Sequence, residues 1–225
     1  MTDVLSSDVA ALVAAANPDP EPVLEDLAAH AEARSFPFLG PAAGHFVRTL
    51  ARATGASRVF EFGSGFGYSA AWWAGALGPD GELVLTDYDA SNLETAREFL
   101  SRGGYAPAIS YEVGDAVEVY ERYEPGWDAV LVDHEKSRYG ETLDEIEAGL
   151  APGAVVVADN VMEGPFEPAD VLAALEGESD STAAAGVADY LSRLRSDPDF
   201  ESVVVPLGEG LSVAVYDPDE PASRG

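Results

Sequence analysis

The sequence predicts a doubly wound α/β fold, in which helices cover both faces of a mainly parallel sheet. Short and nearly continuous apolar runs of strand length alternate with segments of helical periodicity along most of the chain. Most of these runs end directly in glycine, aspartate or asparagine. Because ligands bind outside the carboxyl ends of the strands in such sheets, we expect these terminal residues to meet at one rim.

Three helices are expected ahead of the first strand, and together they form a helical cap region over residues 1–55. The helical spacing covers 4–15 and 23–34, and a third helix starts at Gly40 with a proline behind it and stops at Gly55. We expect one domain over 1–217 and a flexible tail over 218–225.

A glycine-rich loop follows the first predicted strand, in the stretch RVFEFGSGFGYSAAWW over 58–73. Gly63, Gly65 and Gly67 let the backbone bring its N–H groups against a ligand, and the start of the next helix favours negative charge. The dinucleotide fingerprint requires glycine where this chain has Tyr68, which disfavours a nicotinamide cofactor. A tight turn that binds nothing stays open as the alternative.

The second strand, an apolar run over 83–85, ends in Thr86 and Asp87, twenty residues past Gly67. A carboxylate at this strand tip can accept two hydrogen bonds from a ribose diol. Ser69 adds a hydroxyl in the first turn of the helix after the glycine loop. These features predict a ligand that carries a nucleoside.

The rest of the chain continues the alternation of strands and helices. Helices are expected over 90–102, 137–150 and 187–195, and strands over 108–113, 127–132, 154–158, 201–206 and 211–216. The segment 163–186 is rich in Gly, Glu, Ser and Ala and receives no assignment. Seven strands result when the first two are included.

Polar residues follow the fourth and fifth predicted strands. Asp133 comes directly after 127–132, and Asp159 and Asn160 come after 154–158. Two carboxylates and an amide carbonyl form an oxygen-only set, which favours Mg²⁺, Mn²⁺ or Ca²⁺ over zinc. Each of these residues alone would also fit a helix cap or a simple turn.

Lys136, three residues after Asp133, is the only lysine in the chain. A solvated lysine in the first turn of a helix is the alternative interpretation. We expect a general base, because an amine can take up a proton beside a bound dication, whereas a guanidinium does not deprotonate.

Composition restricts the function classes further. The chain of 225 residues has no cysteine, which excludes disulfides and thiolate zinc sites, and it carries 41 acidic against 12 basic residues for a net charge of −29. This charge disfavours nucleic-acid and anionic membrane partners and suggests a halophilic, salt-rich environment. No apolar run is long enough for a membrane span and no secretion signal is present, so we expect a cytoplasmic protein.

Taken together, these motifs resemble the metal-dependent class I S-adenosylmethionine (SAM) O-methyltransferases, the family of the catechol and caffeoyl-coenzyme A O-methyltransferases. The resemblance covers 38–216 and rests on EFGSGFGYSA at 61–70, Asp87, GDA at 114–116, VDHEKSRY at 132–139, ADNV at 158–161 and GEGLSVAVY at 208–216. It implies a Rossmann-like seven-stranded sheet whose last strand is antiparallel.

The resemblance also implies a role for each matching residue. The methionine end of the cofactor would be held by Glu61, Gly63, Ser64 and Ser69, with Gly65 and Asp133 in the same cofactor-binding set, the ribose by Asp87 and the adenine by Ala116. Mg²⁺, or Mn²⁺ or Ca²⁺ in its place, would be bound by Asp133, Asp159 and Asn160, and Lys136 would take the proton from the accepting hydroxyl.

The implied activity is methyl transfer from SAM to a hydroxyl of a small, catechol-like acceptor. A metal-independent methyltransferase, a non-catalytic SAM-binding protein and a dehydrogenase remain as alternatives. Glu135 departs from the tryptophan that walls the substrate in the catechol enzyme, and 163–186 aligns with neither branch of the family. The resemblance allows both monomers and homodimers.

Overall fold

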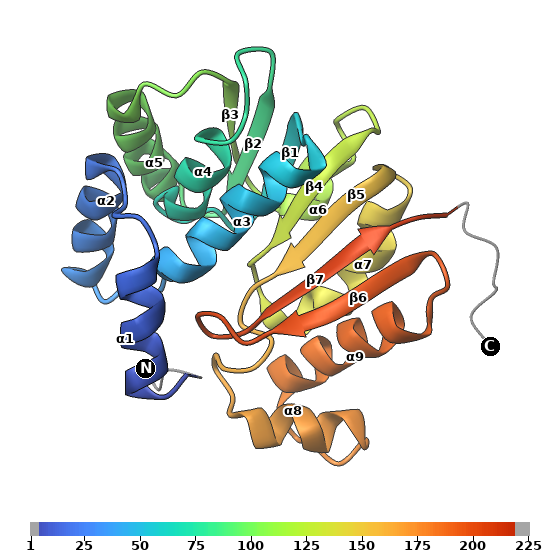
Figure 1. The fold of residues 1–225 in the computed structure, drawn as a ribbon. Coiled ribbons are helices and arrows are strands. Elements are labelled where there is room, and N and C mark those ends of the chain that lie inside the picture. The colour runs from blue at the N-terminus through green and yellow to red at the C-terminus, as the bar shows by residue number, and fades with distance from the viewer. Residues whose placement is uncertain (1–4, 219–225) are drawn as a thin grey trace.

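The computed structural model describes residues 5–218 and contains a seven-stranded sheet in the order β3-β2-β1-β4-β5-β7-β6 (Figure 1). Strands β1 to β5 pair with one another in parallel, whereas β7 is antiparallel to both β5 and β6. The predicted α/β fold is therefore confirmed, including the antiparallel last strand. Apart from Pro218, the predicted tail lies outside the described residues.

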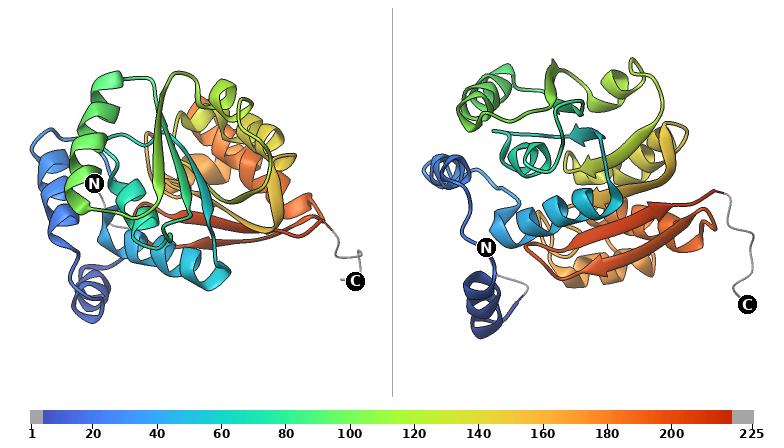
Figure 2. Two further views of the ribbon diagram at one scale, coloured as in Figure 1. Left: turned by 90° about the horizontal axis from the view of Figure 1, so that it is seen from above. Right: turned by 45° about the horizontal axis from the view of Figure 1, so that its top comes forward.

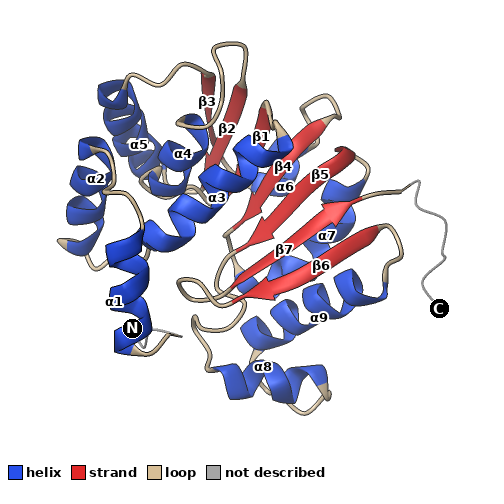
Figure 3. Ribbon diagram, in the orientation of Figure 1, coloured by secondary structure: helices blue, strands red, loops and turns tan. Residues whose placement is uncertain are grey.

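The elements alternate along the chain as expected from the sequence (Figure 3). The strands are β1 (Arg58–Phe62), β2 (Glu82–Asp87), β3 (Ala108–Val113), β4 (Trp127–Val132), β5 (Leu150–Ala158), β6 (Phe200–Val205) and β7 (Leu211–Tyr216). The helices are α1 (Ser7–Ala16), α2 (Pro22–Glu32), α3 (Gly40–Thr54), α4 (Tyr68–Ala74), α5 (Ala90–Gly103), α6 (Ala116–Tyr120), the 3-10 turn η1 (Lys136–Arg138), α7 (Tyr139–Glu147), α8 (Pro168–Leu175) and α9 (Thr182–Ser196).

Helices cover both faces of the sheet and enclose two apolar cores (Figure 2). Helices α3, α4 and α5 lie on one face, with α2 packed against α4 and α5, and helices α6, α7 and α9 lie on the other. Trp72 and Trp73 of α4 are fully buried in the first core. Because the central strands are buried on both sides, their sequences are apolar without alternation.

The structure differs from the sequence prediction around α7, where the expected helix over 137–150 is shorter. Helix α7 ends at Glu147, and β5 already begins at Leu150, which pairs with Trp127 of β4. The chain turns at Gly149, whose carbonyl accepts hydrogen bonds from the N–H groups of Gly126 and Trp127. A Cβ on Gly149 would come within 2.3 Å of the Tyr120 hydroxyl, so only glycine fits at this close approach.

The unassigned segment 163–186 contains α8 and the first turns of α9. Pro168 occupies the first position of α8, and the Asp170 carboxylate accepts a hydrogen bond from the Glu167 N–H at 2.9 Å. At the start of α9 the Ser181 hydroxyl accepts from the Ala184 N–H at 3.2 Å. Both helix starts carry local signals that the bias of the segment toward Gly, Glu and Ser obscured.

The N-terminal helices are present as predicted. Helix α3 contributes Ala43, Val47 and Ala51 to the first core, whereas α1 buries none of its residues. Within residues 5–218 no helix has the length and apolar character needed to cross a membrane.

Candidate active site

The glycine-rich loop between β1 and α4 lies against two neighbouring strand ends. Gly63, Gly65 and Gly67 have φ angles of +85°, +49° and +80°, a region that favours glycine. A Cβ on Gly63 would come within 2.5 Å of the Asp133 carbonyl oxygen, so a side chain at this position would clash with the segment after β4. On the other side, the Gly65 N–H donates to Asp87 Oδ2 at 3.0 Å. The loop therefore joins the ends of β2 and β4.

A cavity of about 610 Å³ opens at these strand ends. All but one of the residues to which the family resemblance assigns a role line it, namely Gly63, Ser64, Gly65, Ser69, Asp87, Ala116, Asp133, Lys136, Asp159 and Asn160, whereas Gly67 of the loop does not. The expected meeting of the strand ends at one rim is thus observed.

The exception is Glu61, which is fully buried in β1 and is not part of the cavity wall. Neither oxygen of its carboxylate has a hydrogen-bond partner within residues 5–218. Burial raises the pKa of Glu61 to about 8, although the nearby Ser69 and Ser64 hydroxyls oppose this rise. Since both serines line the cavity, Glu61 lies one layer behind the wall, and its contact with a cofactor stays a prediction.

Asp87 ends β2 and presents its carboxylate to the cavity. Besides the bond from Gly65, its Oδ1 accepts from the Asp89 N–H at 2.8 Å and from Asn92 Nδ2 at 3.2 Å. These bonds fix the carboxylate at the strand tip, where a ribose diol would be recognised. The contact with ribose stays a prediction.

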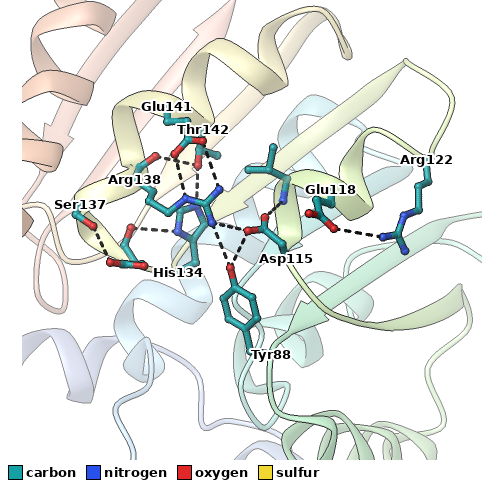
Figure 4. Close-up of polar contacts among 11 residues, drawn as sticks. Tyr88, Asp115, Glu118, Arg122, His134, Ser137, Arg138, Glu141 and Thr142 are labelled. Carbon is teal, nitrogen blue, oxygen red and sulfur yellow. Dashed lines mark hydrogen bonds and ion pairs between the residues drawn. The ribbon is translucent and has the colours of Figure 1, made fainter.

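A polar bridge, formed by Tyr88, Asp115 and Arg138, connects the loops that follow β2, β3 and β4 (Figure 4). Asp115 Oδ2 accepts from the Tyr88 hydroxyl at 2.8 Å and from Arg138 at 2.7 Å, and Arg138 also donates to Glu141 at 3.0 Å. Partial burial opposes ionisation of Asp115, but the hydrogen bonds from Arg138 and Tyr88 outweigh it and lower the pKa of this carboxyl to about 2. All three bridge residues line the cavity.

Sequence reasoning missed this bridge, although its members stand close to residues that were singled out. Tyr88 directly follows Asp87, Asp115 precedes Ala116, and Arg138 lies two positions after Lys136. The local pattern shows no pairing among them, because the partners lie on three separate strand ends.

Lys136 is held in place from two sides inside the cavity. Its Nζ donates to Asp133 Oδ1 at 2.7 Å and to the Tyr139 hydroxyl at 2.8 Å, and only 11% of its side chain is exposed. The Tyr139 hydroxyl in turn donates to the Asp159 carbonyl at 2.9 Å. The alternative of a solvated lysine on a helix surface is therefore wrong. Tyr139, a missed residue, connects the lysine to the end of β5.

Asp133 and Asp159 form an acidic pair beside Lys136. Burial raises the pKa of both carboxyls, that of Asp159 well above its usual range, and the charge of Asp133 adds to the rise at Asp159. Asn160, also buried, donates its backbone N–H to Asp159 Oδ1 at 2.7 Å. Lys136 offsets the charge of Asp133, and ionisation of Asp159 beside it would add a second negative charge that a further cation could offset.

The oxygen atoms at the ends of β4 and β5 are the candidate metal ligands. In the part of the chain that the structure describes, no three His, Cys, Asp or Glu side chains are grouped to hold a metal. The expected ligands are instead two carboxylates and the amide of Asn160, all lining one cavity. This oxygen-only set fits a hard dication such as Mg²⁺.

Helix α9 supports the lysine from outside the cavity. A Cβ on Gly186 would come within 2.3 Å of the Lys136 carbonyl oxygen and 2.6 Å of the Ser137 backbone, so the helix can lie this close only with glycine there. The segment that the sequence left unassigned thus holds the backbone that carries Lys136.

Another part of the cavity wall is apolar and aromatic. It is formed chiefly by Phe36, Pro37, Phe38 and Leu39 before α3, together with Phe66, Tyr68 and Pro165. The rings of Phe36 and Phe66 lie 4.3 Å apart between centroids, and those of Phe38 and Tyr68 lie 4.8 Å apart. A flat apolar ligand would find contacts here.

Known proteins share both the sequence and the fold. Residues 16–216 match the O-methyltransferase family. A catechol O-methyltransferase from Mycobacterium tuberculosis is 30% identical over 188 residues, which cover 82% of this chain and 82% of that protein. The O-methyltransferase TomG from Streptomyces achromogenes, involved in tomaymycin synthesis and solved with SAM, has a TM-score of 0.80 at 26% identity and covers 93% of this chain and 96% of its own.

A further solved structure, the O-methyltransferase from Bacillus cereus in complex with S-adenosylhomocysteine (SAH), shares the fold with a TM-score of 0.81 at 20% identity, over 93% of this chain and 97% of that one. The family match extends over nearly the whole described chain and includes every residue of the cavity wall. The chain therefore belongs to the O-methyltransferase family and is a SAM-dependent O-methyltransferase of the catechol O-methyltransferase type.

Proposed function

We propose that the enzyme methylates a hydroxyl group of a small, catechol-like acceptor with the help of a divalent cation. One observation carries this proposal: Lys136, bound to Asp133 at 2.7 Å, lies in the same cavity as Asp159, Asn160 and the glycine-rich loop. Cofactor binding alone would not require a lysine together with the partly buried Asp133 and the buried Asp159.

The metal would be held by Asp133, Asp159 and Asn160. A dication bound there would supply Lewis acidity, because it can hold both oxygens of a vicinal diol and lower the pKa of the hydroxyl that is methylated. The raised pKa values of Asp133 and Asp159 support this role, since an added cation would offset the cost of their two buried charges.

Lys136 would accept the proton from the acceptor hydroxyl through Nζ. The Tyr139 hydroxyl, 2.8 Å from Nζ and itself anchored to the Asp159 carbonyl, orients the amine toward the cavity. The freed oxygen then attacks the methyl carbon, and the bond between that carbon and the donor sulfur breaks. The products are a methyl ether and SAH, and the acceptor proton is on Lys136.

The glycine-rich loop and the strand ends would hold the cofactor. All of these residues line the cavity; Gly63, Ser64, Gly65 and Ser69 would hold the methionine end, Asp87 the ribose and Ala116 the adenine. These assignments are tested by SAM affinity rather than by activity.

The acceptor would occupy the aromatic part of the cavity. Phe36, Phe38 and Pro165 line the cavity and would suit the flat ring of a catechol, whose hydroxyls would point toward the acidic pair. The net charge of −29 disfavours bulky anionic acceptors such as coenzyme A thioesters. Small neutral catechols are therefore the first compounds to try.

The proposal is tested by methyl transfer from SAM to a panel of small catechols in KCl-rich buffer, with Mg²⁺ and then with excess chelator. We expect transfer with Mg²⁺ and its loss with chelator. Lys136→Ala should lower kcat by about 10²–10⁴-fold, the usual contribution of a general base, and Lys136→Arg should not restore it.

Calorimetry of SAM binding serves as the control, because both variants should bind the cofactor like the wild type. Transfer that survives the chelator would favour a metal-independent methyltransferase. Intact SAM binding without transfer to any catechol would refute the proposed acceptor class.

A further inference from the structure

Glu209 lies in the turn between β6 and β7. It is half-buried, lines the cavity, and belongs to the GEG motif at 208–210, for which no role has been described above. Its Oε2 accepts a hydrogen bond from Asn160 Nδ2. Glu163 and Asp133 are acidic neighbours of Glu209.

The chemistry of this contact determines which end of the Asn160 amide faces Glu209. A carboxylate can only accept hydrogen bonds, so the amide must present its NH₂ group to it. The amide oxygen of Asn160 then remains for the cavity. An asparagine without such a partner could rotate its amide by half a turn and offer nitrogen, which is no ligand for Mg²⁺.

The backbone holds Glu209 in this position. Its carbonyl accepts from the Met162 N–H at 3.2 Å and the Glu163 N–H at 2.9 Å, and the Val161 N–H donates to the Gly210 carbonyl at 3.0 Å. The turn between β6 and β7 is thus fastened to the loop after β5.

Asn160 itself has a φ of +58°, a left-handed conformation in which asparagine is one of the few tolerated side chains. Its backbone N–H is engaged by Asp159 Oδ1 at 2.7 Å. With the backbone fixed, the remaining freedom of Asn160 is the orientation of its amide.

We infer that Glu209 is a positioning residue for metal binding, which orients the Asn160 amide so that its oxygen is offered to the cation. This inference rests on the proposed divalent metal. Outer partners of this kind fix ligand orientation in metal sites, and their loss typically lowers metal affinity by about 10–100-fold.

The test is Mn²⁺ binding to the SAH-bound enzyme, followed by electron paramagnetic resonance of the free ion, in the wild type, Glu209→Ala, Glu209→Gln and Glu163→Ala. Glu209→Ala should weaken Mn²⁺ binding by about 10–100-fold. Glu209→Gln should retain most of the affinity, because its carbonyl oxygen can still accept from Asn160 Nδ2. Glu163→Ala removes a neighbouring charge without removing that hydrogen bond, and should stay within about threefold of the wild type, since a charge screened by salt is worth little.

The outcomes separate the inference from the proposed function. If wild-type enzyme binds no Mn²⁺, both the metal and the role of Glu209 are refuted. If the wild type binds Mn²⁺ and Glu209→Ala binds it equally well, only the inference fails. Equal losses in Glu209→Ala and Glu163→Ala would reduce the effect to net charge and refute positioning.

A loss in Glu209→Gln as large as in Glu209→Ala would point to direct ligation by the carboxylate and also refute positioning. The SAH dissociation constant should be the same in all four proteins. It shows that each variant is folded, so that a loss of Mn²⁺ binding can be assigned to the metal site.

Discussion

Replacement of Glu61 by glutamine should make the enzyme more stable, and increasingly so as the pH rises. The Glu61 carboxyl is fully buried in β1, no hydrogen bond to either oxygen is present within residues 5–218, and its pKa is raised from 4.5 to about 8 by burial. Glutamine has nearly the same shape but cannot ionise. The variant therefore removes the titration and leaves the packing in place.

The direction of this pH dependence follows from the pKa of Glu61 in the unfolded chain, 4.5, and in the folded chain, about 8. Below pH 4.5 both the folded and the unfolded chain carry the proton on Glu61, so its titration does not change the free energy of unfolding. Between pH 4.5 and 8 the unfolded chain releases the proton while the folded chain keeps it, so the free energy of unfolding falls as the pH rises. Each pH unit in this range corresponds to about 1.4 kcal/mol.

The assay is urea unfolding of the wild type and Glu61→Gln at pH 5 and pH 7 in KCl-rich buffer. The stability advantage of Glu61→Gln should grow by about 2–3 kcal/mol between the two pH values. The exposed Glu94, changed to glutamine, is the matched control and should show no such growth. An advantage that stays constant with pH would refute a neutral Glu61 in the folded enzyme. Because the cofactor carries positive charge, the same variant should bind SAM more weakly if Glu61 contributes to that site.

Three further predictions follow from single contacts and from the overall charge. Arg138→Gln removes the bridge to Asp115 and should lower the free energy of unfolding by about 1–2 kcal/mol, as measured by urea unfolding. It should also raise the KM for SAM in steady-state kinetics. An unchanged KM would mean that the bridge does not shape the cofactor cavity. Gly186→Ala places a Cβ 2.3 Å from the Lys136 carbonyl oxygen, so the free energy of unfolding should fall by about 1–3 kcal/mol and methyl transfer should be slower. A variant as active as the wild type would contradict the supporting role of α9. Raising KCl from about 0.1 M to about 1 M should increase the melting temperature, because salt screens the repulsion among charges that sum to −29, and a flat response would refute the expected adaptation to salt.

The positions of the cavity residues could be read from the sequence because they depend on chain direction. In a parallel sheet the carboxyl ends of the strands meet at one edge, so a polar residue directly after a buried strand is placed in three dimensions by its position alone. Asp87, Asp133 and Asp159 were found in this way, and the glycines at 63–67 marked the loop between them. The antiparallel last strand came from the family resemblance, and the order of the strands came only from the structure.

The partners of these residues could not be read in the same way, because they are selected by side-chain direction across segments far apart in the chain. Arg138 meets Asp115, Glu209 meets Asn160, and α9 meets Lys136 through Gly186, all without a local pattern that announces the pairing. Glu61 was marked by its motif, but only the structure shows that its carboxylate is buried in β1 and is absent from the cavity wall. The sequence by itself therefore determined which residues reach the rim of the sheet, through the alternation of buried strands and polar ends. The tertiary structure alone decided how each is oriented, because hydrogen bonds and close packing form only between surfaces that folding brings together.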